Sequence, residues 1–305
     1  MRFVAVALVL VFAAAPACAQ HRHDSTSRSG APPLFQGLGP VRHPVTTKNA
    51  DAQKYFDQGL RLSYAFNHDE AGRSFREAAR LDSTCAMAWW GAALVLGPNI
   101  NLPMSAEAES EAYRLMQRAQ TVSAGASEAE RSYIAALARR YGAEAGAARA
   151  SRDSAYANAM RDVMKRYPDD LDAAVLTAEA LMDLRPWDLW TLDGKAQPGT
   201  EEIVSILESV LKRNQDHTGA IHLYVHAVEA SPEPARAERY ADRLAELAPY
   251  AGHLVHMPTH IHLRVGKYDR AVELNARAVA ADRDYIQKHG ATGVYPMMYY
   301  PHNIH

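Results

Sequence analysis

The apolar positions of this chain follow a helical period along most of its length. From Ala50 onward, apolar residues recur three and four positions apart, with polar residues between them. Ala, Glu, Arg and Leu dominate this region, and all four favour helices. No stretch alternates apolar and polar residues in the manner of a half-buried strand. The pattern predicts one all-α domain over residues 50–305.

A longer period of 34 residues lies over the helical one. Counted from Ala52 as position 1, small or aromatic side chains occupy positions 4, 8, 20, 24 and 27, which are Tyr55, Gly59, Ala71, Phe75 and Ala78. These are packing positions of the tetratricopeptide repeat. An aromatic ring fills the space between the paired helices, and Gly or Ala lets the two backbones approach closely.

The turn between the two helices of such a pair also recurs. Asn67-His68-Asp69 is expected to form the first turn and to cap the second helix. Gly266-Lys267-Tyr268 repeats the turn, and Ala271 and Ala278 follow at positions 20 and 27. The recurrence predicts a right-handed α-α superhelix of tetratricopeptide-like helix pairs.

Two insertions interrupt the array, at residues 97–103 and 184–199. The second insertion contains Trp187, Asp188 and Trp190. Loops of this length in a compact array tend to be functional or to lie over a groove. The alternative is that the two tryptophans only pin the loop to the core.

The first 19 residues predict export. Arg2 is followed by the uncharged apolar run Val4–Ala15 and then by small residues, which is the order of a secretory signal peptide. Ala17-Cys18-Ala19 predicts cleavage before Gln20, so we expect a periplasmic or secreted protein. A lipid anchor on Cys18 is the less favoured alternative. No later stretch is apolar for long enough to predict a membrane span.

Residues 20–49 are rich in Ser, Gly, Pro and His, and predict a flexible leader that settles onto the first helices near Pro44. The whole chain carries 33 Lys and Arg against 35 Asp and Glu. Without an excess of positive charge, nucleic acid is not expected as a partner. Cys85 is the one cysteine beyond the signal peptide, and its Ala, Met and Trp neighbours predict a core position.

Histidines concentrate in the last third of the chain, where ten of the fourteen lie from His217 onward. His222 and His226 are one helical turn apart, and Glu229 follows three residues later. His253, His256 and His260 fall within an arc of about 60° on a helix that turns 100° per residue. His262 follows His260 by two residues and therefore points to the opposite side of the helix, so we exclude it from the set.

The repeat period links these two groups. His222 precedes His256 by 34 residues, and His226 precedes His260 by 34 residues, so each pair shares a position in successive repeats. Stacked helices lie about 8–10 Å apart, which would bring the imidazoles into one patch on the concave groove of the array. Glu179 is expected on the same groove, and His302 and His305 repeat the spacing of His253 and His256.

Imidazoles one helical turn apart are suited to chelate a metal, and a nearby carboxylate can complete or orient the shell. We therefore expect a divalent transition metal (Zn, Cu or Fe) in the groove. The candidate ligands are His222, His226, Glu229, His253, His256, His260, His302 and His305.

Two other functions remain open from the sequence. A metal-dependent enzyme could use the same groove with Glu229 or Glu179 as general base and the Trp187–Trp190 loop as a lid. A metal-free adaptor could instead bind a protein or peptide partner through histidine hydrogen bonds. The sequence carries no Gly-rich phosphate loop, H-E-x-x-H motif, haem attachment motif or nucleophile elbow.

Several blocks resemble a family of bacterial exported tetratricopeptide-repeat proteins with histidine-rich segments. They include HLYVHAVEAS from His222, GHLVHMPTHIHLRVGKY from Gly252 and the closing PHNIH. The resemblance covers nearly everything after the leader, and it implies the superhelical fold without a settled activity. Members of that family continue into further helices, so we expect this sequence to be truncated at His305, where a helix should begin.

Overall fold

The computed structural model describes residues 30–146 and 148–304. Over these residues the chain is helical, and its only strand-like pairings are two isolated bridges, Asn99 with Leu102 and Trp190 with Ala196. The prediction of an all-α fold is therefore confirmed. The signal peptide, the first part of the leader and His305 lie outside the described residues.

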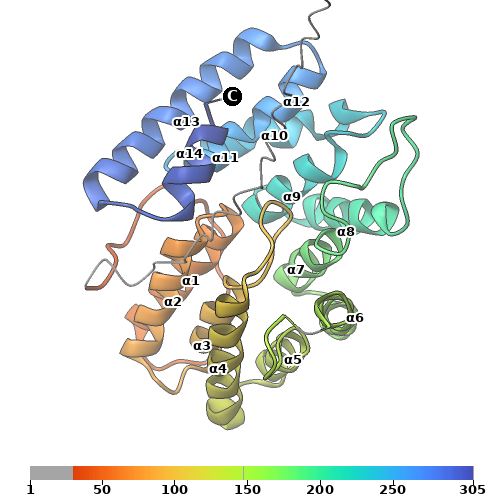
Figure 1. Cartoon of the computed structure of the whole chain (residues 1–305). Helices are drawn as coiled ribbons and strands as arrows, with labels where there is room; N and C mark the ends of the chain where they lie inside the picture. The colour runs from red at the N-terminus through yellow and green to blue at the C-terminus, as the bar shows by residue number, and fades with distance from the viewer. Residues whose placement is uncertain (1–29, 147, 305) are drawn as a thin grey trace, which may run out of the picture.

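Most of the helices are joined by short connections, and longer ones cover residues 95–105, 138–148 and 183–199 (Figure 1). Those of the first half are α1 (Ala50–Tyr64), α2 (His68–Leu81), α3 (Ala86–Leu94), α4 (Ala106–Val122), α5 (Glu128–Leu137), α6 (Arg149–Arg166) and α7 (Leu171–Met182). Those of the second half are α8 (Thr200–Arg213), α9 (Thr218–Val228), α10 (Glu238–Leu247), α11 (Gly252–His256), α12 (Pro258–Arg264), α13 (Tyr268–His289) and α14 (Tyr300–His302). A π-helical turn, Tyr295–Tyr299, precedes α14.

Side-chain caps set several helix starts. The Asn67 side chain accepts from the Glu70 N–H, so α2 begins at His68 as the sequence predicts. Ser127 and Glu130 form a reciprocal capping box at the start of α5. Asp170 caps α7 by accepting from the Ala173 N–H. These caps satisfy backbone donors that the first helical turn leaves without partners.

Small residues let the first helices pack closely around one aromatic ring. A Cβ atom placed on Gly59 of α1 would lie 2.7 Å from the Phe75 ring of α2, and one on Gly91 of α3 would lie 2.4 Å from it. Phe75 is fully buried. The Phe75 ring thus fills the space between α1 and α2, and Gly59 lets the two helices approach closely, as expected.

The C-terminal helices pack near the first helix pair. Figure 1 shows α11, α13 and α14 gathered above the α1–α2 pair. The Tyr285 hydroxyl of α13 donates to Glu70 at 2.7 Å, and the Val294 N–H donates to Asp69 at 3.2 Å. The segment before α14 therefore closes over the first helix pair, and the region between them becomes part of the interior.

The described part of the leader, residues 30–49, is held by specific hydrogen bonds. The Phe35 N–H donates to Gln58 at 2.7 Å, and the Tyr55 hydroxyl donates to the Pro32 carbonyl at 2.9 Å. The leader was expected to settle onto the first helices near Pro44, whereas within the described residues it is already held at Gly30, whose carbonyl accepts from Arg73 at 3.1 Å. Buried polar side chains of α1 supply the anchoring groups, which the composition of the leader does not reveal.

Cys85 is buried, as expected, and burial raises the pKa of its thiol to about 11. Among the helices of residues 30–146 and 148–304, none is both long and apolar enough to cross a bilayer.

Candidate metal centre

Six histidines from three parts of the fold come together in two groups of three. His222 and His226 lie on α9, His253 and His256 on α11, His260 on α12 and His302 on α14. Pro258 lacks an N–H, so α11 ends at His256 and α12 begins at Pro258. Met257 keeps helical dihedral angles between them (φ −50°, ψ −38°). The α11 and α12 histidines therefore remain on one side of a nearly continuous helix.

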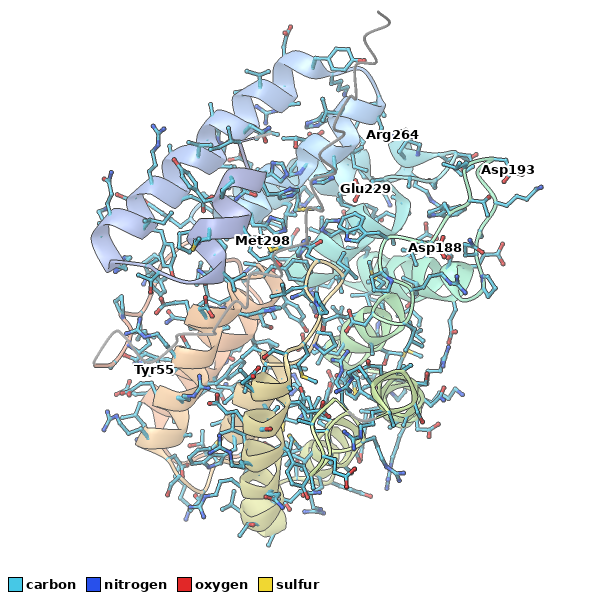
Figure 2. All side chains as sticks on the ribbon, viewed as in Figure 1. Tyr55, Asp188, Asp193, Glu229, Arg264 and Met298 are labelled. Atoms are coloured by element: carbon cyan, nitrogen blue, oxygen red, sulfur yellow. The ribbon has the colours of Figure 1, made fainter. Side chains whose placement is uncertain are left out.

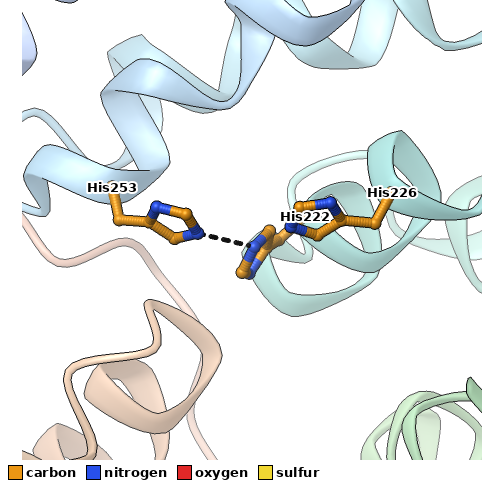
Figure 3. Close-up of side chains that lie close together, drawn as sticks. All are labelled: His222, His226 and His253. Atoms are coloured by element: carbon orange, nitrogen blue, oxygen red, sulfur yellow. Dashed lines mark hydrogen bonds between the residues drawn. The ribbon is translucent and has the colours of Figure 1, made fainter. Parts of the chain in front are cut away.

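The first group, triad 1, consists of His222, His226 and His253. Each can offer one ring nitrogen such that the three atoms lie within 4.8 Å of one another. Figure 3 shows the His253 ring reaching across to the two rings of α9. The Nε2 atoms of His222 and His253 are 3.2 Å apart. The Nε2 atom of His226 is buried and has no hydrogen-bond partner among the described residues.

The hydrogen bonds at Nδ1 determine the tautomers of triad 1. His222 Nδ1 lies 2.6 Å from the Tyr64 carbonyl oxygen, and His226 Nδ1 lies 2.9 Å from Glu229 Oε1. A carbonyl or a carboxylate can only accept, so in each ring Nδ1 carries the proton and Nε2 carries the lone pair.

The Nδ1 atom of His253 also faces an acceptor, which hydrogen bonds between other side chains hold in place. Asn303 donates its amide N–H to Asp282 at 2.7 Å, which turns Asn303 Oδ1 toward His253 Nδ1 at 3.2 Å. Tyr295 donates to the other oxygen of Asp282 at 2.8 Å. Because Asn303 Oδ1 accepts, His253 also presents the lone pair of Nε2.

The second group, triad 2, consists of His256, His260 and His302, and its ligand atoms also lie within 4.8 Å of one another. The Nε2 atoms of His256 and His260 are 3.0 Å apart. His260 Nδ1 donates to Glu229 Oε2 at 2.6 Å, and His256 Nδ1 donates to Asn275 Oδ1 at 2.7 Å. These two rings, like those of triad 1, therefore direct Nε2 lone pairs toward each other.

Two lone pairs that face each other at about 3 Å repel, because neither nitrogen has a proton to donate. A cation placed between them removes the repulsion. Two nitrogens bound at about 2.0–2.1 Å to a tetrahedral metal ion lie about 3.3 Å apart. The distances of 3.2 Å in triad 1 and 3.0 Å in triad 2 are close to that separation.

Glu229 joins the two triads. Its Oε1 accepts from His226 of triad 1, and its Oε2 accepts from His260 of triad 2. The ring centroids of His226 and His260 are 5.5 Å apart. Burial by itself would raise the pKa of Glu229, but the hydrogen bonds from both histidines hold that pKa well below its usual range. An ionised Glu229 thus orients one ligand of each triad.

Burial favours the neutral form of three of these imidazoles, His222, His253 and His256. His222 and His253 are fully buried, and their pKa values are lowered first by burial and then by neighbouring histidines. The same causes lower the pKa of His256 to about 3. A neutral imidazole is the form that binds metal, so these groups are ready to bind at neutral pH.

The spacing of these histidines predicted that they line a concave groove, but four of them, His222, His226, His253 and His256, are buried in the interior. Phe66 covers triad 1, with its ring centroid 4.4 Å from that of His222 and stacked at 5.6 Å on His253. Tyr299 packs edge-on against His253 at 5.0 Å. Phe66 adopts a left-handed backbone conformation (φ 55°) in the α1–α2 turn. The closure of the C-terminal segment over the first pair encloses the site.

The other candidate residues have different surroundings. His262 lies apart from both triads, as expected, and its Nε2 bonds Asp242 at 2.9 Å. Glu179 is half-buried near the charge of Asp183, which bonds Arg140. Burial and the charge of Asp183 raise the pKa of Glu179. His253 belongs to triad 1 and also lies beside triad 2, with its ring centroid 6.1 Å from that of His256 and 5.6 Å from that of His302.

The sequence analysis did not find the acceptors that orient the rings, which are Tyr64, Asn275, Asn303 and Asp282. Only Asn303 carried a signal, because it lies within the PHNIH block beside His302. The Tyr64 carbonyl is a backbone group that any residue could supply, so nothing in the sequence identifies it.

A different network surrounds Asp172 at the start of α7. His43 Nδ1 bonds Asp172 at 2.9 Å, His217 Nε2 lies 3.2 Å from it, and the Tyr64 hydroxyl donates to it at 2.6 Å. Burial by itself lowers the pKa of His43, but the hydrogen bond and charge of Asp172 more than offset this and raise it. His43, Asp170 and Asp172 also lie within metal-binding distance.

A cavity of about 200 Å³ adjoins triad 1. It ends on His226 and Glu229, and the 184–199 loop forms one wall. No protein family model matches the chain, and no curated protein is significantly similar to it.

Proposed function

We propose that this protein is an exported helical-repeat scaffold that binds two transition-metal ions at adjacent sites, one in triad 1 and one in triad 2. One observation carries the proposal. Five rings donate through Nδ1 to fixed acceptors, and this arrangement leaves Nε2 lone pairs facing one another at 3.2 Å and 3.0 Å. Metal-binding histidines characteristically donate their second ring nitrogen to a carboxylate or carbonyl in this way.

The ligand type favours Zn, Cu or Fe. Both triads offer nitrogen only, whereas Ca²⁺ and Mg²⁺ prefer oxygen ligands. Glu229 contacts Nδ1 atoms rather than the Nε2 side of the triads. We therefore assign Glu229 an orienting role, with His222, His226 and His253 as ligands of one ion and His256, His260 and His302 as ligands of the other.

A metal-dependent enzyme is the second candidate function, and the cavity at His226 favours it. Three protein ligands for each ion leave a coordination position for water or substrate, as in catalytic zinc sites. Glu229 is a weak candidate for general base, because both of its oxygens accept imidazole protons and its pKa is low. The metal-free adaptor is less favoured, since the histidines are buried and present little surface to a peptide.

The wider architecture belongs to the same proposal. Consecutive helices pack against each other, α1 with α2 and α3 with α4, in the manner of tetratricopeptide-like pairs in a right-handed superhelix. The contact between Gly59 and Phe75 agrees with that repeat. Export to the periplasm or the medium rests on the Val4–Ala15 run and the cleavage motif before Gln20.

Metal analysis of protein purified without a His tag tests the proposal. We expect about two zinc ions per chain after equilibration with zinc, and cobalt substitution should give the absorption bands of nitrogen-ligated Co²⁺. The double variant His226→Ala/His260→Ala removes one ligand from each triad and should lose both ions. His262→Ala is the matched control, because His262 is a buried helical histidine that lies outside both triads. Binding that is lost in the control and kept in the double variant would contradict the assignment.

A further inference from the structure

The cavity beside triad 1 has apolar and aromatic walls. Ile100, Met182 and Leu189 line it and are buried, and the indoles of Trp187 and Trp190 complete the wall. Both insertions of the array thus contribute, since Ile100 comes from residues 97–103 and the two tryptophans from residues 184–199. A cavity of about 200 Å³ is smaller than the usual 300–1,000 Å³ of ligand sites. It therefore suits a molecule with one ring or a short chain.

The two tryptophans are positioned by different means. The Trp190 indole N–H donates to the Ala227 carbonyl at 2.7 Å, which fixes the ring against α9. Trp187 has a left-handed backbone conformation (φ 59°) and is 58% exposed, and its ring meets His226 edge-on with centroids 5.4 Å apart. A non-glycine residue in this conformation is uncommon and concentrates at ligand sites. Trp187 thus lies between solvent and His226, a proposed metal ligand of triad 1.

The charged groups at the cavity are mainly cationic. Arg264, at the end of α12, lines the cavity and makes no ion pair within residues 30–146 and 148–304. Figure 2 labels Arg264 and Glu229, which both line the cavity. Arg185 also lines the cavity, and its guanidinium pairs with the exposed Asp188 at 2.7 Å. Glu229 is the one acidic lining residue, and two imidazole N–H groups neutralise much of its effect.

We propose that this cavity binds a small organic carboxylate, with its apolar body between the tryptophans and its carboxylate between Arg264 and the ion of triad 1. The metal contact rests on the proposed function, whereas the contact with Arg264 does not. A guanidinium matches a carboxylate in two parallel hydrogen bonds, and an exposed Arg without an acidic partner is available for it. The apolar walls favour a carboxylate with an apolar body over an inorganic anion, because only the arginines of the lining could replace the hydrogen bonds that a small anion makes with water.

Benzoate and benzamide form a suitable pair of probes, since they share shape and ring and differ in charge. Binding is measured by calorimetry and by tryptophan fluorescence on zinc-loaded protein and on protein treated with chelator. We expect zinc-loaded protein to bind benzoate at least tenfold more tightly than benzamide. Arg264→Gln should remove most of that preference and leave benzamide binding unchanged. Arg114→Gln, an exposed arginine on α4, is the matched control and should have no effect.

The outcomes separate the two proposals. Equal affinity for benzoate and benzamide in both metal states overturns the carboxylate site, and so does tighter binding of inorganic phosphate than of benzoate. Zinc content is measured on the same samples, so a failure to bind zinc is detected independently. If zinc does not bind but benzoate still binds in an Arg264-dependent manner, the carboxylate site stands and the metal centre is refuted. If zinc binds and the benzoate preference is absent, only the carboxylate site is refuted.

Discussion

Two histidine networks in this molecule have similar composition and opposite electrostatics. Around Asp172, His43 and His217 direct ring nitrogens at one carboxylate, so positive and negative groups compensate each other internally. In the two triads, the Nδ1 protons point outward to separate acceptors and the Nε2 lone pairs point inward at each other. The first network contains its own carboxylate, whereas in the second the Nε2 lone pairs face one another.

The pKa values of the histidines also differ between the two networks. His43 has a raised pKa because the hydrogen bond and charge of Asp172 outweigh its burial. His222, His253 and His256 have lowered pKa values because burial and neighbouring imidazoles act together. A cluster of histidines therefore does not by itself identify a metal site. The position of the lone pairs and the sign of the nearby charge distinguish a metal centre from a structural ion pair.

The largest expected effect comes from removing the centre of the compensated network. Asp172→Ala leaves His43, His217 and the Tyr64 hydroxyl without their acceptor, and breaking such a buried pair costs about 3–5 kcal/mol of unfolding free energy. Urea unfolding measures this cost. Asp169→Ala, at a fully exposed side chain of the same turn, should cost less than about 1 kcal/mol. The folded fraction of Asp172→Ala should still bind two zinc ions. Loss of zinc binding in this variant would show that the two histidine networks are not independent.

The next effect tests whether Glu229 serves both triads. Gln has one acceptor oxygen in place of two, so Glu229→Gln should weaken zinc binding in both sites by about 10–100-fold. Asn275→Ala removes an acceptor from His256 alone and should weaken one site only. Competition with a chromophoric chelator gives the two affinities. Equal weakening of both sites by Asn275→Ala would show that the triads are not separate sites.

The smallest effect is a difference in the sign of the pH dependence. In metal-free protein, His256 has a folded pKa of about 3 and an ordinary value of 6.5, so its contribution to stability is present above pH 6.5 and is lost as pH falls. Between pH 6.5 and 5 this loss is on the order of 1–2 kcal/mol. His256→Gln should remove it, as measured by urea unfolding in the presence of chelator.

His43 should show the reverse. Its folded pKa is raised, so its contribution is present below the ordinary value and is lost as pH rises through the folded pKa. The destabilisation caused by His43→Gln should therefore shrink between pH 6 and pH 9. A common sign for the two variants would contradict the contrast between the networks.

Much of the local structure was predictable from the sequence. The helical period gives an all-α chain, Asn67 caps α2 as expected, and Gly59 packs on Phe75. The 34-residue spacing that relates His222 to His256 and His226 to His260 correctly predicts that α9 and the α11–α12 segment lie together. The spacing did not predict the division into two triads, since His302 joins only after the chain folds back.

The sequence by itself determined which residues are helical and which histidines share a helix face, because both follow from spacing along a regular backbone. Tertiary structure alone decided which nitrogen each ring presents. The acceptors for His222, His253 and His256 lie 158, 50 and 19 residues away in the chain, so no local pattern encodes them. Tertiary structure also decided the burial of the site, because Phe66 and the C-terminal segment cover it only when the residues before α14 fold back onto the α1–α2 pair.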